Sequence, residues 1–182
     1  MPKVIIFLTD GFEEMEALVP ADILHRAGVK VSLLSITGKL EVTGSHDIKV
    51  VADGLFDKNT DISDADMLIL PGGPGASSYI ENRALTDALQ AQHVKDKYIA
   101  AICAAPVTLG KLGLLKDKAA TCYPAMEGDL IAAVKKQDAV VTDGNITTGR
   151  AAGASAEFGL KLAELLVGSE VATKVKNAMY LY

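Results

Sequence analysis

The chain contains 182 residues, of which 49% are hydrophobic and 23% are charged, as in an ordered globular protein with room for one sizeable core. Its formal net charge of -5 argues against nucleic acid or an anionic membrane as the main partner, because both reward clustered Lys and Arg side chains, and we expect no bilayer-spanning segment because the apolar runs are short. Two cysteines, Cys103 and Cys122, are too few for a disulfide framework, so we expect a reducing, cytoplasmic location.

Buried strands and amphipathic helices alternate through the first part of the sequence. Continuous apolar runs typical of strands buried on both faces occur at 4–8, 29–36, 66–70 and 98–103. Helical patterns follow them at 13–27, 82–94 and 107–115. Gly28 is expected to end the first helix, and Pro20 is expected to kink or split it. Two strand-like pieces around Gly44 predict a hairpin over 40–51.

The second half is less regular but continues the alternation. Its expected elements are a helix at 125–134, paired strands at 139–142 and 146–148 around the turn 143–145, and helices at 155–167 and from 169 onward. This order predicts an α/β fold in which a mostly parallel, doubly wound sheet carries helices on both faces. We expect a single domain over residues 1–182.

Cys103 lies where an apolar strand gives way to small residues, Pro106 and a helical stretch. Such an elbow is at the carboxyl edge of a parallel sheet, where α/β folds place their active sites. The amino end of the following helix favours a thiolate there. Cys103 is therefore a candidate nucleophile, against the alternative of an inert, buried cysteine.

Topology decides which groups reach this thiol. The helices that end with His25 and His93 end at the opposite edge of the sheet, roughly 20 Å away at about 3.3 Å per strand residue. His46 lies in the predicted hairpin and stays an open alternative, including across a dimer interface. Because no imidazole is well placed, Glu16 is the best candidate partner for Cys103.

Glu16 extends the apolar stripe of the first helix that contains Val19 and Ile23. A carboxyl group on that stripe is partly buried and tends to keep its proton. A protonated Glu16 donates a hydrogen bond that favours a thiolate. The glycine turn at 72–75 ends a strand at the same edge, and its backbone N–H groups are candidates for an oxyanion site.

Four motifs in order resemble the ThiJ/PfpI superfamily, in particular its DJ-one (parkinsonism-associated deglycase) branch. They are 13–16 (EEME), 70–73 (LPGG), 100–106 (AAICAAP) and 149–150 (GR) followed by 157–158 (EF). The resemblance runs nearly end to end. It implies a flavodoxin-like three-layer sandwich, a homodimer and no cofactor.

The resemblance also implies roles for individual residues. Cys103 would be a strained nucleophile that is hydrogen-bonded by a protonated Glu16. The backbone of Gly72, Gly73 and Ala104 would line an oxyanion or substrate site, and Arg150 would lie near the mouth of the pocket. None of the three histidines has the paired spacing of metal ligands, so we expect no metal site.

Two positions depart from the family pattern. Tyr123, in the run 121–124 (TCYP), replaces a family histidine near the cysteine, which disfavours histidine-assisted hydrolysis. His46 matches an arginine that lies at the dimer interface of relatives.

Three hypotheses about function follow. The leading hypothesis is an oxidative-stress-related enzyme of the glyoxalase or deglycase type that acts on small reactive carbonyls or glycated protein through Cys103 and Glu16. The alternative is a redox sensor or redox-regulated chaperone without turnover, in which Cys103 is oxidised. An intracellular cysteine peptidase is a third and less favoured hypothesis, because the histidine is missing.

Overall fold

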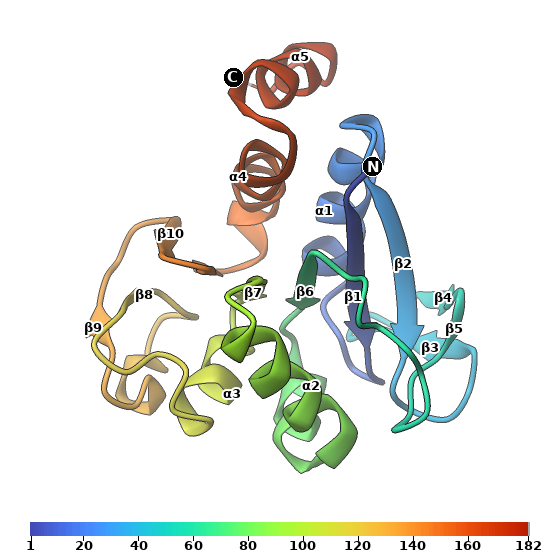
Figure 1. Cartoon of the computed structure of the whole chain (residues 1–182), viewed down its shortest axis with the longest axis vertical. Coiled ribbons are helices and arrows are strands. Elements are labelled where there is room, and N and C mark those ends of the chain that lie inside the picture. Colours follow the sequence, from blue (N-terminus) through green and yellow to red (C-terminus); the bar gives the residue numbers. More distant parts are fainter. Residues whose placement is uncertain (182) are drawn as a thin grey trace.

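A seven-stranded sheet forms the centre of the computed structural model, which describes residues 1–181 (Figure 1). Its strands are β1 (Lys3–Leu8), β2 (Lys30–Ser35), β5 (Gly54–Leu55), β6 (Met67–Leu70), β7 (Tyr98–Ile102), β10 (Val140–Asp143) and β11 (Ile146–Gly149). They lie in the order β10-β11-β7-β6-β1-β2-β5. Neighbours are parallel except for the β10–β11 hairpin. This confirms the predicted flavodoxin-like α/β fold.

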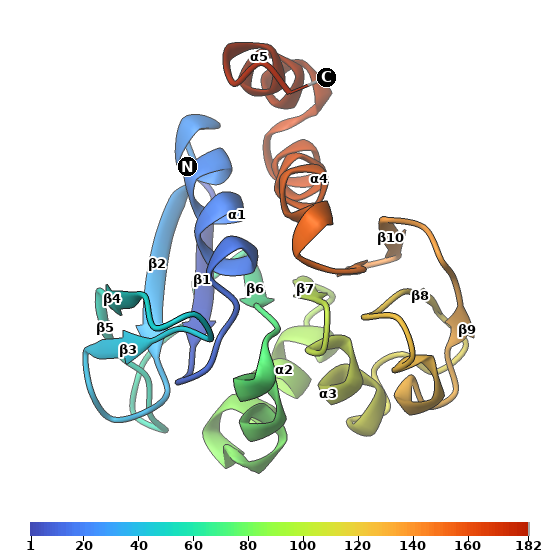
Figure 2. The same cartoon turned by 180° about the vertical axis from the view of Figure 1, so that it is seen from behind.

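Helices cover both faces of this sheet, as Figures 1 and 2 show. The helices are α1 (Glu14–Arg26), α2 (Arg83–Val94), α3 (Pro106–Lys111), α4 (Ser155–Val167) and α5 (Ser169–Ala178), with 3-10 turns η1 (Pro74–Glu81), η2 (Glu127–Asp129) and η3 (Ala152–Ala154). Alternate residues of β1 face opposite cores: Val4 and Ile6 pack with residues of α1, α4 and α5, and Ile5 and Phe7 pack with residues of α2 and α3. Successive side chains of a strand point to opposite faces of the sheet, so a strand that is buried on both faces contributes to both cores.

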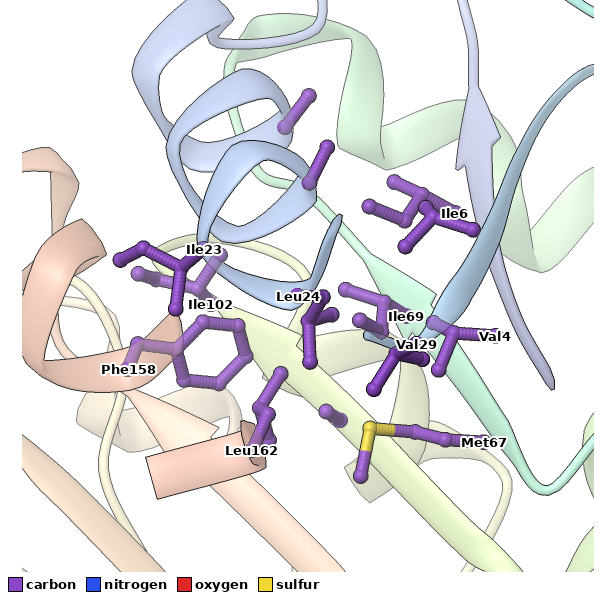
Figure 3. Close-up of a cluster of buried hydrophobic side chains, with 14 of the residues drawn as sticks. Val4, Ile6, Ile23, Leu24, Val29, Met67, Ile69, Ile102, Phe158 and Leu162 are labelled. Carbon is purple, nitrogen blue, oxygen red and sulfur yellow. The ribbon is translucent and has the colours of Figure 1, made fainter. Parts of the chain in front are cut away.

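The contact between α1 and α4 explains why Pro20 does not break its helix. Figure 3 shows Ile23 of α1 beside Phe158 of α4 in the buried cluster. The two helices approach closely at Gly159, where an added Cβ would lie 3.0 Å from the Cα of Pro20 and 2.9 Å from a methyl carbon of Ile23. The expectation of a split helix was wrong, because α1 continues through Pro20 and burial against α4 offsets the lost backbone hydrogen bond.

The predicted hairpin over 40–51 forms β3 (Glu41–Thr43) and β4 (Lys49–Val51), which pair antiparallel outside the main sheet. It docks on the loop between β1 and α1 by backbone hydrogen bonds. The N–H of Gly11 donates to the Thr43 carbonyl at 2.8 Å, and the N–H of Ser45 donates to the Phe12 carbonyl at 2.8 Å. The hairpin therefore lies at the carboxyl edge of β1.

The helix expected at 125–134 was wrong. This segment contains only the turn η2 and then β9 (Val134–Lys135), which pairs with β8 (Ala119–Ala120). Ala125 and Ala132 adopt φ angles of 73° and 59°, in the left-handed region that interrupts a right-handed helix.

None of the helices in residues 1–181 combines the length and the apolar character needed to cross a membrane.

Candidate active site

Cys103 is held in a left-handed backbone conformation at the carboxyl end of β7, with φ of 63°. Its N–H donates to the Gly149 carbonyl at 2.9 Å, and its carbonyl accepts from the N–H of Tyr123 at 2.8 Å. Only 8% of the residue is exposed. The predicted elbow at the sheet edge is therefore present, and hydrogen bonds on both sides hold it in a conformation that costs an L-residue about 1–2 kcal/mol.

Glu16 lies in the first turn of α1 and is fully buried. The carboxylate of Glu13 caps this helix by accepting from the N–H of Glu16 at 2.7 Å. Glu16 Oε2 accepts a hydrogen bond from the N–H of Gly72 at 2.8 Å. Glu16 Oε1 has no hydrogen-bond partner within the described residues, so it is the oxygen on which a proton fits.

The two side chains control each other's protonation. Burial raises the pKa of Glu16 to about 7, although the neighbouring Cys103 thiol and the Gly72 N–H lower it. Burial also raises the pKa of the Cys103 thiol to about 12, and the charge of the Glu16 carboxylate adds to this. The thiolate that the sequence predicts, favoured by the following helix and by a protonated Glu16, is therefore opposed by the burial of the sulfur. Sulfur keeps its proton while Glu16 is ionised, and the raised pKa of Glu16 makes its carboxylate a suitable acceptor for the thiol proton.

The glycine turn after β6 contributes its amides in two different ways. The N–H of Gly72 binds Glu16, so it does not serve the oxyanion site in which the resemblance placed it. The amides of Gly73 and Ala104 instead face the Cys103 sulfur and lower its pKa. These two amides are the donors available to a developing oxyanion.

Gly72 also leaves no space for a side chain. A Cβ there would lie 2.6 Å from Cys103 Cβ and 2.6 Å from Glu16 Oε2. The absence of a Cβ at this position is what allows the carboxyl and the cysteine to approach each other.

A cavity of about 650 Å³ opens beside the cysteine. Cys103, Gly73 and Ala104 line it together with further residues of their own two segments and residues of three others. Those residues are Glu13, Ser45, His46, Pro74, Ala76, Ser77, Ile80, Val107, Thr108, Lys111, Tyr123, Met126 and Asp129. The cavity is large enough for a small substrate and for the water that its hydrolysis requires.

His46 is the histidine that sequence topology left open, and it lines this cavity. Its Nδ1 lies 2.7 Å from Glu14 Oε2, and Glu14 raises its pKa. His25 and His93 are not among the residues that line the cavity, in agreement with their placement at the opposite edge. The docked hairpin thus brings His46, the histidine left open by topology, to the same cavity as Cys103.

Two other residues differ from expectation or were left open. Arg150 does not line the cavity in the described structure; its side chain is exposed and donates to the Gln137 carbonyl at 2.9 Å. Its expected place at the pocket mouth is not what the structure shows. Cys122 is buried in the core cluster that packs on α2 and α3, and burial raises the pKa of its thiol to about 11.

One group of side chains in the described part of the chain brings potential ligand atoms within 4.8 Å of one another, namely Glu13, Glu14 and His46. Their polar atoms already satisfy one another and the backbone. Glu13 caps α1, and the Glu14 oxygens accept from the N–H of His46 and from the Ser45 hydroxyl. The cluster is therefore explained by hydrogen bonding.

Sequence comparison agrees with the resemblance noted from the motifs. Residues 2–165 match the DJ-1/PfpI family. Protein dj-1beta of Drosophila melanogaster is 38% identical over 179 residues, which cover 96% of this chain and 95% of that protein. The Parkinson disease protein 7 homolog of Danio rerio is 34% identical over 183 residues, which cover 98% of this chain and 97% of that protein.

Solved structures show the same similarity over the whole fold. The crystal structure of Drosophila melanogaster DJ-1beta superposes with a TM-score of 0.92 at 36% identity, covering 100% of this chain and 98% of that one. Oxidized DJ-1 of Toxoplasma gondii superposes with a TM-score of 0.94 at 33% identity, covering 100% of both chains.

Proposed function

Because this chain belongs to the DJ-1/PfpI family, which has roles related to oxidative stress, we propose that it is a cofactor-independent enzyme acting on small reactive carbonyls or their adducts. The reaction is of the glyoxalase or deglycase type and proceeds through Cys103 with Glu16. The observation that carries the proposal is that Cys103, whose thiol lines an open cavity, has the buried Glu16 carboxyl as its neighbour behind that cavity. The proposed compartment is a reducing cytoplasm, in which a free thiol persists.

The first chemical step follows from the coupled titration of this pair. As Sγ of Cys103 attacks an aldehyde carbon, the thiol proton passes to the Glu16 carboxylate. The carbonyl oxygen becomes an alkoxide that the amides of Gly73 and Ala104 stabilise. Glu16 then returns the proton to that oxygen, which gives a hemithioacetal. A carboxyl with a pKa of about 7 suits both transfers at neutral pH.

Substitutions of the two residues test this mechanism with methylglyoxal as substrate. Cys103→Ser is expected to abolish turnover, and Glu16→Gln is expected to lower it roughly 10²–10⁴-fold, because Gln accepts the Gly72 hydrogen bond but transfers no proton. Cys122→Ser serves as the matched thiol control. Full activity in either the Cys103 or the Glu16 variant would refute the proposal.

A redox sensor is the second candidate, favoured by the relative from Toxoplasma gondii that was solved in an oxidized form. In this case the Cys103 thiolate takes one oxygen atom from each of two peroxide molecules, releasing two waters and leaving a sulfinic acid. Mass spectrometry after mild peroxide treatment distinguishes the two candidates. Selective oxidation of Cys103 without carbonyl turnover supports the sensor, and an unmodified Cys103 excludes it.

The proposed assembly is a homodimer formed through α1 and the docked hairpin. Met15 at the start of α1 is 51% exposed, and Ile48 and Val51 in the hairpin are 53% and 69% exposed. Met15 and Ile48 flank the contact between Glu14 and His46, so these apolar side chains belong to one region. Analytical ultracentrifugation of the wild type and of Ile48→Asp checks the assembly. A wild-type monomer at micromolar concentration would contradict it.

A further inference from the structure

The pairing of Glu14 with His46 has no part in the chemistry described so far. Glu14 lies at the start of α1 and is buried, whereas the hairpin supplies its partners. Glu14 Oε1 accepts from the N–H of His46 at 2.7 Å, and Oε2 meets the Ser45 hydroxyl at 3.1 Å and His46 Nδ1 at 2.7 Å. A carboxylate fixed on Nδ1 orients the ring and sets its tautomer. Among the described residues, none binds Nε2.

The position of His46 on the cavity differs from that of Glu16. The side chain of His46 is 69% exposed, whereas Glu16 is fully buried and Cys103 is 8% exposed. In the single chain His46 therefore lies at the exposed rim of the cavity, whereas Cys103 lies at its floor and Glu16 lies behind Cys103, outside the lining. A group at the mouth meets water, and groups at the floor meet the bound carbonyl.

The proposed reaction has one step, the activation of water, for which the buried Glu16 carboxyl is poorly placed. After the hemithioacetal forms on methylglyoxal, a proton leaves the former aldehyde carbon and another arrives at the ketone carbon. This internal redox shift leaves a lactoyl thioester on Cys103. Water must then add to the thioester carbonyl and lose a proton, while the C–S bond breaks and lactate departs. The net change is methylglyoxal plus water to lactate plus a proton.

We propose that His46, oriented by Glu14, is the general base that activates the water for hydrolysis of acyl-Cys103. This inference rests on the proposed function. Nε2 takes a proton from the water as the water oxygen attacks the acyl carbon. The Cys103 sulfur leaves as a thiolate and takes up the second proton of the added water, which the lactic acid product gives up through the Glu16 carboxylate. The imidazolium then releases its proton to solvent at the cavity mouth.

The charges around His46 set the direction of its pH dependence. The hydrogen bond and charge of Glu14 raise its pKa above 6.5, and the charges of Glu13 and Asp47 raise it further. Lys111 and Asp129 are the other charged residues that line the cavity. A general base works in its neutral form, so hydrolysis of the acyl-enzyme is expected to accelerate as pH rises through a value above 6.5.

Single-turnover experiments with methylglyoxal on the full chain test this role. His46→Asn keeps an amide donor toward Glu14 but offers no basic nitrogen. It is expected to form acyl-Cys103 and to release lactate roughly 10²–10⁴-fold more slowly than wild type. Hydroxylamine attacks thioesters without a general base, so it should release the trapped acyl group as a hydroxamate. His25→Asn, an exposed histidine at the end of α1, is the matched control.

Each outcome has a distinct meaning. If the wild type releases lactate and His46→Asn releases it at the same rate, the role of His46 is overturned and the proposed function stays intact. A variant that fails to acylate assigns His46 to an earlier step and also overturns the inference. A wild-type protein that forms no Cys103 adduct refutes the proposed function itself. Glu14→Gln supplies a second variant, in which the pH midpoint of acyl release is expected to fall toward 6.5.

Discussion

The Glu16 carboxyl and the Gly72 amide meet at 2.8 Å through one oxygen only, Oε2. The other oxygen, Oε1, is buried without a partner among residues 1–181. An unpaired carboxylate oxygen in the interior is unfavourable, whereas a carboxylic acid places its proton there. Burial raises the pKa of this carboxyl to about 7, and the asymmetry between the two oxygens indicates where the proton lies.

The first prediction concerns stability against pH. Burial raises the pKa of Glu16 in the folded protein to about 7 from its ordinary value of 4.5, so the folded state binds the proton more tightly. The contribution of Glu16 to the free energy of unfolding is therefore greatest below pH 4.5. It falls by about 3 kcal/mol at most as pH rises from there to about 7. Glu16→Gln should remove this loss. Urea unfolding at about pH 5 and about pH 8.5 measures it, with the exposed Glu81→Gln as control. Equal pH dependence of wild type and Glu16→Gln would contradict the prediction.

The second prediction concerns the space at Gly72. Gly72→Ala places a Cβ against Cys103 and Glu16, so it should destabilise the fold by about 1–3 kcal/mol and abolish reaction at the thiol. The control is Gly153→Ala, where nothing lies within 4 Å of an added Cβ. Thermal unfolding and alkylation of Cys103 by iodoacetamide provide the measurements. Unchanged alkylation kinetics in Gly72→Ala would show that the close approach is not required.

The third prediction tests the backbone strain at Cys103. Glycine adopts a φ of 63° without the steric cost that an L-residue carries. Cys103→Gly is therefore expected to be at least as stable as Cys103→Ala. Ala101 lies two residues earlier in the regular strand and serves as the comparison. There, Ala101→Gly is expected to lower the free energy of unfolding by roughly 0.5–1 kcal/mol. Chemical denaturation of these variants determines the sign at both positions, and the same sign at both would rule out strain.

The sequence was sufficient to predict the sheet, the elbow and the carboxyl partner, because each depends on local periodicity and on which edge a strand ends. Cys103 follows an apolar run, and Glu16 lies on an apolar stripe. The place of His46 depends instead on hydrogen bonds between a hairpin and a distant loop. A turn sequence carries no signal for where the turn docks, although a buried acidic residue such as Glu14 indicates that some partner must exist.

The failed prediction at 125–134 has a related cause. Ala, Met, Glu and Leu favour helix, but intrinsic propensity is a weak signal that tertiary structure overrides. Here β8 and β9 pair across the segment, which requires turns at Ala125 and Ala132. Such long-range pairing is invisible to a count of helix-forming residues.

The fourth prediction concerns acid stability of the hairpin contact. Although burial opposes ionisation of Glu14, the hydrogen bonds from His46 and Ser45 lower its pKa to about 2. The stabilisation is present above pH 4.5 and is lost as pH falls toward 2. Glu14→Gln should therefore lower the melting temperature at about pH 6, and the difference from wild type should shrink at about pH 3. Glu41→Gln, which removes an exposed pair with Lys49, is expected to have little effect at either pH. A deficit in Glu14→Gln that is constant with pH would contradict the prediction.

Two backbone hydrogen bonds hold the main chain of Cys103 in place, whatever atom replaces or modifies the sulfur. One bond joins its N–H to Gly149 in a neighbouring strand, and the other joins its carbonyl to Tyr123 in a separate loop. Neither bond involves the side chain. Changes at the sulfur, whether by substitution, acylation or oxidation, therefore leave the direction of the Cα–Cβ bond fixed, so the reactivity of this protein can vary without any movement of its chain.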